Sequence, residues 1–120
     1  MWFLGLNKKI SIFGDGTQTR TLNYVDDTID GFFTLIDNNV TDPINVGGED
    51  EMSVIDIAKR VVSVLGGEEN FEHVGRPEDE PMHRKPNIDK LKKLGYKSKV
   101  SLDDGLKRTC EVMREEGFIK

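Results

Sequence analysis

The chain has 120 residues with 17 basic and 22 acidic side chains, so its formal net charge is −5 at pH 7. Hydrophobic residues make up 36% and charged residues 32% of the composition, which is typical of one soluble globular domain. The acidic balance excludes a general nucleic-acid-binding surface, and no apolar run in this sequence approaches the ~18 residues of a membrane span. The single cysteine, Cys110, excludes an internal disulfide and suits the reducing cytoplasm. We therefore expect a cytoplasmic protein with one domain over residues 1–120.

Two strands are predicted at the start of the chain. Ile10–Phe13 alternates apolar and polar residues, and Thr19–Val25 is rich in residues that favour strands. The sequence Gly14-Asp15-Gly16 between them predicts a hairpin turn. The turn shares two glycines with a dinucleotide fingerprint, but Thr19 stands where the third glycine belongs, and a strand-forming stretch follows instead of a helix. We therefore reject a dinucleotide site here.

The first helix is predicted to begin near Asp26 or Asp27, since either could cap it. Its apolar residues recur at the i, i+3, i+4, i+7 spacing of one helix face, namely Ile29, Phe32, Phe33 and Ile36. Asn38 and Asn39 suit its end. The next short apolar run, Pro43–Val46, predicts a buried strand.

The second helix has the clearest signals. Ser53 is a favourable N-cap, and Asp56 occupies the acidic position of a capping box. One apolar stripe then runs over residues 54–65 and stops before Gly66, a residue that commonly ends helices.

The segment 76–86 is organised differently from the rest. A strand is predicted just before it, at Phe71–Val74, but three of the four prolines fall inside the segment, where they disfavour a helix or an inner strand. We expect a stiff extended loop, and such loops commonly carry binding residues. Its charged members are Arg76, Glu78, Asp79, Glu80, His83, Arg84 and Lys85.

Two further helices are predicted toward the end of the chain. The third is short, with Asn87 as its cap and Gly95 as its end. The fourth begins at Ser101, has Asp104 three residues later and closes at Gly117. The resulting order of elements is α/β, with too few strands for a doubly wound sheet. We therefore expect a small accessory α/β fold.

Arg20 and Arg84 are the residues best suited to bind a ligand. A guanidinium group presents a rigid fork of donors that matches phosphate, so two forks from separate segments could clamp a pyrophosphate. The plainer alternative, which the pattern alone favours, is that both side chains are solvated or paired with the many nearby acids. His73 and His83 have no partner at ligand spacing, so no metal site is predicted, and Cys110 is expected to pack in the core.

Several motifs follow one another along the chain: GDGTQTRTLNYVDD (14–27), PINVG (43–47), SVIDIA (53–58), RPEDEPMHRKPNI (76–88), LGY (94–96) and VSLDDGL (100–106). Together they resemble the C-terminal substrate-binding region of the extended short-chain dehydrogenase/reductases, the NAD-dependent epimerases and dehydratases of nucleotide sugars. The stretch 76–88 is most similar to UDP-glucuronate decarboxylases. The resemblance covers the chain from about Phe3 to Phe118.

This resemblance implies a small mixed α/β domain that closes over a UDP-sugar. It implies that Arg20 and Arg84 contact the pyrophosphate of that substrate, against the plainer alternative. Phe13 stands where the family often has tyrosine, close to the nucleotide, and Tyr24 and Asn45 lie in matching motifs. The implied function is substrate binding in an NAD-dependent nucleotide-sugar enzyme, such as one that converts UDP-glucuronate to UDP-xylose.

Two parts of the family pattern are missing from this sequence. The family binds NAD at a Gly-rich turn of an N-terminal Rossmann domain and transfers protons with a Tyr-x-x-x-Lys pair. Here the residues four after Tyr24 and Tyr96 are Thr28 and Val100. We therefore expect no catalytic residue, cofactor or metal in this chain alone, with NAD bound in the full-length family. The expected partners are a UDP-sugar, a Rossmann half on another chain, and further copies of this chain in a homo-oligomer.

An alternative from a different class is a non-catalytic binding or interaction module that keeps the fold but has lost the ligand. Apolar surface that packs against the Rossmann half in the family would be exposed in this chain. Because large exposed apolar patches favour association, we expect self-association under either hypothesis.

Overall fold

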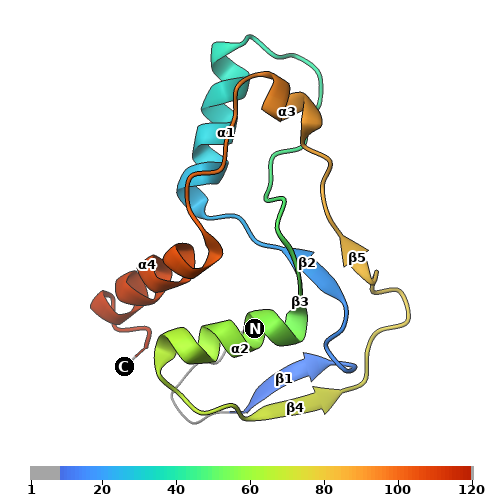
Figure 1. The fold of residues 1–120 in the computed structure, drawn as a ribbon, viewed down its shortest axis with the longest axis vertical. Helices are drawn as coiled ribbons and strands as arrows, with labels where there is room; N and C mark the ends of the chain where they lie inside the picture. Colours follow the sequence, from blue (N-terminus) through green and yellow to red (C-terminus); the bar gives the residue numbers. More distant parts are fainter. Residues whose placement is uncertain (1–8, 120) are drawn as a thin grey trace.

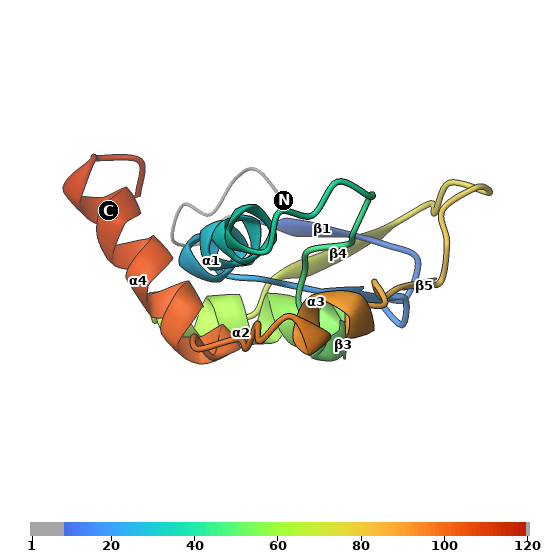
Figure 2. The same cartoon turned by 90° about the horizontal axis from the view of Figure 1, so that it is seen from above.

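The computed structural model describes residues 9–119, in which strands and helices form a small mixed α/β fold, as predicted (Figure 1). The elements are β1 (Ile10–Phe13), β2 (Thr19–Thr21), α1 (Val25–Asp37), β3 (Glu51–Ser53), α2 (Val54–Leu65), β4 (Phe71–Val74), β5 (His83–Arg84), α3 (Asp89–Lys93) and α4 (Leu102–Glu115). They lie in a thin slab with extents of 47 × 38 × 17 Å (Figure 2). Because the slab is thin, many elements keep one face toward solvent.

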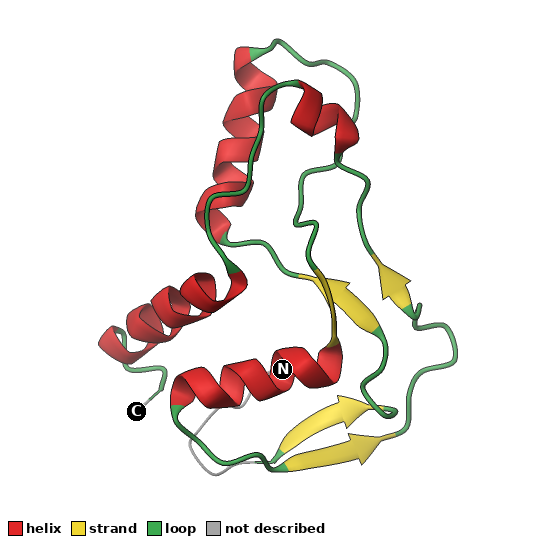
Figure 3. Cartoon of the chain, viewed as in Figure 1, coloured by secondary structure: helices red, strands yellow, loops and turns green. Residues whose placement is uncertain are grey.

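The strands form two small sheets (Figure 3). In the first, β1 pairs in parallel with β4, and Phe13 lies opposite Val74. In the second, β2 lies between an antiparallel β3 and a parallel β5. The predicted hairpin is therefore wrong, because β1 and β2 belong to different sheets. The strand expected over Thr19–Val25 is also shorter and ends at Thr21.

The turn between β1 and β2 directs the chain from one sheet to the other. Gly16 has a φ of +79°, and a Cβ atom here would lie 2.8 Å from Cβ of Ile55, so the position favours glycine. The N–H of Ile55 donates to the Gly16 carbonyl oxygen at 3.0 Å. The buried Gln18 donates its side-chain amide to the Phe13 carbonyl oxygen at 2.9 Å. The bond from Ile55 docks the turn on the start of α2, and the bond from Gln18 closes the turn itself.

Helices α2 and α4 begin as predicted. The Ser53 and Ser101 hydroxyl oxygens accept hydrogen bonds from the N–H groups three residues later, each at 3.2 Å. Helix α2 ends at Gly66, whose φ of +72° is left-handed. The two helices pack together, and Cys110 of α4 is buried, as expected. Within residues 9–119 no helix has the length and apolar character needed to cross a membrane.

Helix α1 differs from its prediction at its start. It begins at Val25 after Tyr24, whose side chain makes no capping hydrogen bond, so the prediction of Asp26 or Asp27 as the N-cap is wrong. Asp27 is instead 1% exposed and accepts hydrogen bonds from the segment 98–100. These bonds tie the first turn of α1 to the chain that leads into α4.

The predicted apolar face of α1 points to solvent. Its exposed fractions are 45% for Ile29, 52% for Phe32, 57% for Phe33 and 65% for Ile36. The opposite face packs closely, since a Cβ atom on Gly31 would lie 2.5 Å from the Val46 side chain. The helix therefore packs through the face that holds Gly31 and leaves these four large apolar side chains uncovered within the described structure.

The core at this end of the slab is a cluster of Ile88, Leu91 and Tyr96 with half-buried Leu35, Ile44 and Val46. The strand predicted at Pro43–Val46 is wrong, because this segment is a loop whose apolar side chains pack on the cluster without a strand partner. Helix α3 begins at Asp89 after Ile88, one residue later than predicted. Asn87 still accepts a hydrogen bond from the Asp89 N–H at 2.9 Å.

Candidate functional site

Arg20 and Arg84 lie side by side on neighbouring strands. Arg20 is in β2, Arg84 is in β5, and the two residues are register partners in a parallel pair. Neighbouring strands are ~4.8 Å apart, so side chains in register leave the sheet close together. The fold thus brings together two arginines that are far apart in the sequence.

The two arginines differ in their contacts. Nη2 of Arg20 lies 2.6 Å from Oε1 of Glu80, and its Nη1 donates to the Pro81 carbonyl oxygen at 3.1 Å. Arg20 therefore pairs with a nearby acid, as the plainer alternative expects. Arg84 is exposed, and its guanidinium group makes no hydrogen bond or ion pair within residues 9–119, so this group is available to a ligand.

A third arginine, Arg76, contacts the same carboxylate. Its Nε lies 3.7 Å from Oε2 of Glu80, and its Nη2 donates to the Glu80 carbonyl oxygen. Both Nε of Arg76 and Oε2 of Glu80 are buried without a hydrogen-bond partner in the described structure. The sequence marked both residues only as members of a charged loop, because their pairing depends on how that loop folds back.

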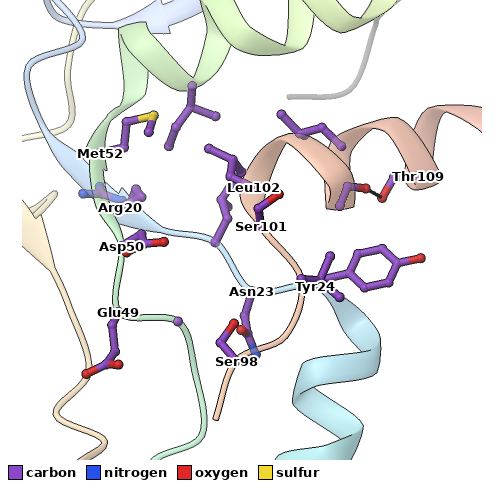
Figure 4. A pocket seen from close by; sticks show the side chains of 16 residues that line it. Arg20, Asn23, Tyr24, Glu49, Asp50, Met52, Ser98, Ser101, Leu102 and Thr109 are labelled. Atoms are coloured by element: carbon purple, nitrogen blue, oxygen red, sulfur yellow. Dashed lines mark hydrogen bonds between the residues drawn. The ribbon is translucent and has the colours of Figure 1, made fainter.

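A cavity of about 230 Å³ opens beside Arg20 (Figure 4). Its walls come from β2, the 48–52 segment, α2 and the start of α4, and they include Tyr24, Met52 and Leu102. Of the five predicted substrate residues, only Arg20 and Tyr24 line it. The other three lie outside this cavity: Phe13 on β1, Arg84 on β5 and Asn45 in the loop before β3.

The other predicted residues have distinct surroundings. Tyr24 lies beneath the Arg108 guanidinium, with 5.6 Å between that group and the ring centroid. Phe13 is 47% exposed at the end of β1. Asn45 donates its side-chain amide to the Asn87 carbonyl oxygen at 3.3 Å, which favours a role in holding the loop.

The structure also brings together Thr19, Glu51 and His83, from β2, β3 and β5. The Thr19 hydroxyl donates to Oε1 of Glu51, and Nδ1 of His83 lies 2.7 Å from that hydroxyl oxygen and 3.0 Å from Oε1 of Glu51. The hydrogen bonds from Thr19 and then His83 lower the pKa of the Glu51 carboxyl. Both partners meet the same ring nitrogen, so this group cannot relay a proton as a hydroxyl–His–carboxylate triad does.

Residues 9–119 do not fit an NAD group. A dinucleotide site needs a glycine turn that opens a helix, so that backbone N–H groups face the pyrophosphate. The glycine turn after β1 leads into β2, and Gly16 is packed against Ile55. Among the described residues there is also no group of three or more His, Cys, Asp or Glu side chains that could hold a metal ion.

A family profile, two curated relatives and a solved structure agree on one family. The profile of the NAD dependent epimerase/dehydratase family matches residues 4–47. UDP-glucuronic acid decarboxylase 1 of Xenopus tropicalis is 33% identical over 91% of this chain, and UDP-glucuronic acid decarboxylase 2 of Arabidopsis thaliana is 34% identical over 91%. A UDP-glucuronic acid 4-epimerase variant from Bacillus cereus, solved with UDP-4-deoxy-4-fluoro-glucuronic acid and NAD, superposes on 92% of the chain with a TM-score of 0.82 and 32% identity.

The matched proteins are much longer than this chain. It spans 26% of the Xenopus relative, 25% of the Arabidopsis relative and 36% of the Bacillus chain. The similarity covers 91% of this chain in both curated relatives and 92% in the Bacillus structure, in agreement with the resemblance drawn from the sequence motifs.

Proposed function

The chain belongs to the NAD dependent epimerase/dehydratase family, and from this membership we propose that it is the C-terminal substrate-binding portion of a nucleotide-sugar enzyme. The curated relatives favour a UDP-glucuronic acid decarboxylase as the enzyme type. The reaction of the whole enzyme would then be a lyase reaction from UDP-glucuronate to UDP-xylose in the cytoplasm.

The register of Arg20 and Arg84 is the observation that carries this proposal. A pyrophosphate carries charge on two adjacent phosphates, and two adjacent guanidinium forks can each bind one of them. The Arg84 guanidinium is unpaired within residues 9–119, and Arg20 lines a cavity large enough to admit part of a ligand. Tyr24 lines the same cavity as Arg20 and would add aromatic surface to the proposed site, while Phe13 is exposed at the end of β1.

NAD and the proton-transfer pair belong, in this proposal, to another part of the enzyme. The dinucleotide cradle is not formed by residues 9–119, and neither tyrosine is followed by lysine four positions later. This chain would bind and orient the sugar nucleotide, while the cofactor supplies the redox chemistry when it is bound beside the sugar.

Calorimetric titration of the 120-residue chain with UDP-glucuronate and with NAD tests the proposal. UDP-glucuronate should bind, NAD alone should not, and Arg20→Ala or Arg84→Ala should abolish the binding. The matched control is Arg60→Ala, because Arg60 is an arginine that pairs with Asp103 and lies outside the proposed site. NAD binding as tight as in a complete enzyme, or UDP-glucuronate binding that ignores both substitutions, would contradict the proposal.

The exposed apolar face of α1 supports a second candidate, a non-catalytic module that self-associates. Phe32 and Phe33 are each more than half exposed on this face, and exposed apolar patches of this kind favour association. A module of this class would keep the fold without binding a nucleotide sugar.

Thermal stability in excess UDP separates the two candidates. A ligand at ~100 times its dissociation constant raises the free energy of unfolding of a binding protein by ~2.7 kcal/mol. An interaction module gains nothing, because UDP does not bind to its folded state. Unchanged stability up to millimolar UDP would favour the second candidate.

A further inference from the structure

Glu80 occupies a position where an anionic ligand would bind. Its Oε1 lies 2.6 Å from Nη2 of Arg20, and its Oε2 lies 3.7 Å from Nε of Arg76. The Glu80 and Arg20 side chains are each 20% exposed, and that of Arg76 is 29% exposed. One carboxylate is thus held between two guanidinium groups and is largely withdrawn from water.

This arrangement leaves hydrogen-bonding capacity unused. Oε2 of Glu80 and Nε of Arg76 are both buried and have no hydrogen-bond partner among the described residues. A buried charged group that lacks a partner costs free energy, and a partly desolvated ion pair gains little unless its remaining atoms are satisfied. A phosphate group brings more acceptor oxygens than a carboxylate and can meet both guanidinium forks.

The loop that carries Glu80 favours its exchange for a ligand. Residues 77–80 form a turn in which the Glu80 N–H donates to the Pro77 carbonyl oxygen at 3.3 Å, and Pro81 follows directly. Apart from Glu80 itself, the residues from Pro77 to Lys85 are exposed. Withdrawal of Glu80 would therefore uncover two arginines without opening the hydrophobic core.

We propose that Glu80 is an internal competitor for the anion site, occupying the Arg20 and Arg76 guanidinium groups until a pyrophosphate-bearing ligand displaces its carboxylate. The proposal rests on the proposed function, because it requires that Arg20 binds the anionic part of the substrate. Glu80 lowers the affinity for weak anions, so that a ligand with several phosphate oxygens is favoured over a single carboxylate or chloride.

Titration of the 120-residue chain with inorganic pyrophosphate tests this competition. Glu80→Gln should bind pyrophosphate at least about tenfold more tightly than the unaltered chain, because one charge-assisted hydrogen bond no longer has to be broken. Glu78→Gln is the matched control, because it removes the same charge from the same exposed loop and Glu78 has no ion pair within residues 9–119. It should leave the affinity unchanged.

The outcomes separate this inference from the proposed function. If the unaltered chain binds pyrophosphate and Glu80→Gln binds it equally or more weakly, Glu80 holds the site in shape, and the competitor is excluded while the proposed function stands. If neither protein binds, the arginines are not an anion site and both ideas fail. Binding by Glu80→Gln alone supports both and indicates that Glu80 competes strongly.

A second measurement uses the unaltered chain and so does not depend on the folding of a variant. The side-chain carboxyl carbon resonance of Glu80 should shift as pyrophosphate saturates the protein, since the carboxylate leaves two guanidinium groups. The Glu78 resonance should stay where it is. Saturable binding with no change at Glu80 would overturn the inference.

Discussion

Two carboxylates of this molecule are withdrawn from solvent in opposite ways. Asp27 on α1 is 1% exposed and receives hydrogen bonds from the Ser98 hydroxyl at 2.9 Å, the Lys99 N–H at 3.1 Å and the Val100 N–H at 3.0 Å. Glu80 in the proline-rich loop is paired with two arginines, but its buried Oε2 has no hydrogen-bond partner among residues 9–119.

The different donors around the two carboxylates indicate that Asp27 stabilises the fold, whereas a ligand can replace the Glu80 carboxylate. Every donor around Asp27 belongs to the backbone or to a short side chain on a fixed segment, so its removal leaves buried donors unsatisfied. The donors around Glu80 are long arginine side chains that can turn to another anion. Saturated hydrogen bonding thus favours a role in stability, and incomplete hydrogen bonding in the charged loop favours a role in binding.

The largest effect is expected at Asp27. Asp27→Ala should lower the free energy of unfolding by about 3 kcal/mol. It leaves buried donors without an acceptor and removes the hydrogen bonds that join α1 to the segment before α4. The exposed neighbour provides the control, and Asp26→Ala should change stability by no more than about 0.5 kcal/mol. Urea denaturation measures both. Equal effects of the two substitutions would show that Asp27 does not lock the fold.

The contribution of Asp27 should also depend on pH. Burial raises the pKa of the Asp27 carboxyl. The hydrogen bonds from Val100, Lys99 and Ser98 outweigh burial, so that the pKa lies below its ordinary value of 3.8. Stability from this group is present above the unfolded pKa and is lost as pH falls through the lower folded-state pKa. Urea midpoints of the unaltered chain and Asp27→Asn should therefore converge at acidic pH. A constant difference down to pH 2 would contradict the assignment.

Without ligand, substitution of Arg20 should lower the free energy of unfolding more than substitution of Arg84. Arg20→Ala should cost about 1 kcal/mol, because it leaves the Glu80 carboxylate short of its main partner. Arg84→Ala should stay within about 0.5 kcal/mol, since that side chain is exposed and unpaired in the described structure. A large stability loss in Arg84→Ala would mean that its guanidinium is already used by the fold.

The smallest effect on folding is expected on the outer face of α1. Phe33 is 57% exposed, so Phe33→Asp should change the free energy of unfolding by less than about 0.5 kcal/mol. It should nevertheless reduce self-association in sedimentation velocity, because the face loses apolar contact area. A strictly monomeric unaltered chain at high concentration would contradict the role of this face.

The sequence predicts locally determined features of this fold well. The starts of α2 and α4 follow from Ser53 and Ser101, whose hydroxyls cap the helix within three residues. The pairing of β1 with β4 and the loop at Pro43–Val46 depend on contacts between distant segments, which periodicity does not encode. The apolar face of α1 is a similar case. Hydrophobic periodicity shows which residues share a helix face but does not show what packs against that face.

The candidate site was only partly predictable for the same reason. Arg20 and Arg84 follow from the family resemblance, and the strand register places them together. Arg76 and Glu80 have no comparable signal, since one acid among several in a charged loop is selected only by the path of that loop. The number of hydrogen-bond partners at Glu80 is a property of the folded chain alone.

Phosphorus NMR of UDP-glucuronate tests the arginine-centred anion site most directly. Addition of the 120-residue chain should shift and broaden both pyrophosphate resonances, and an Arg20→Ala/Arg84→Ala double variant that remains folded should leave both unchanged. Equal shifts with the unaltered chain and the double variant, or no shift with either, would contradict the account.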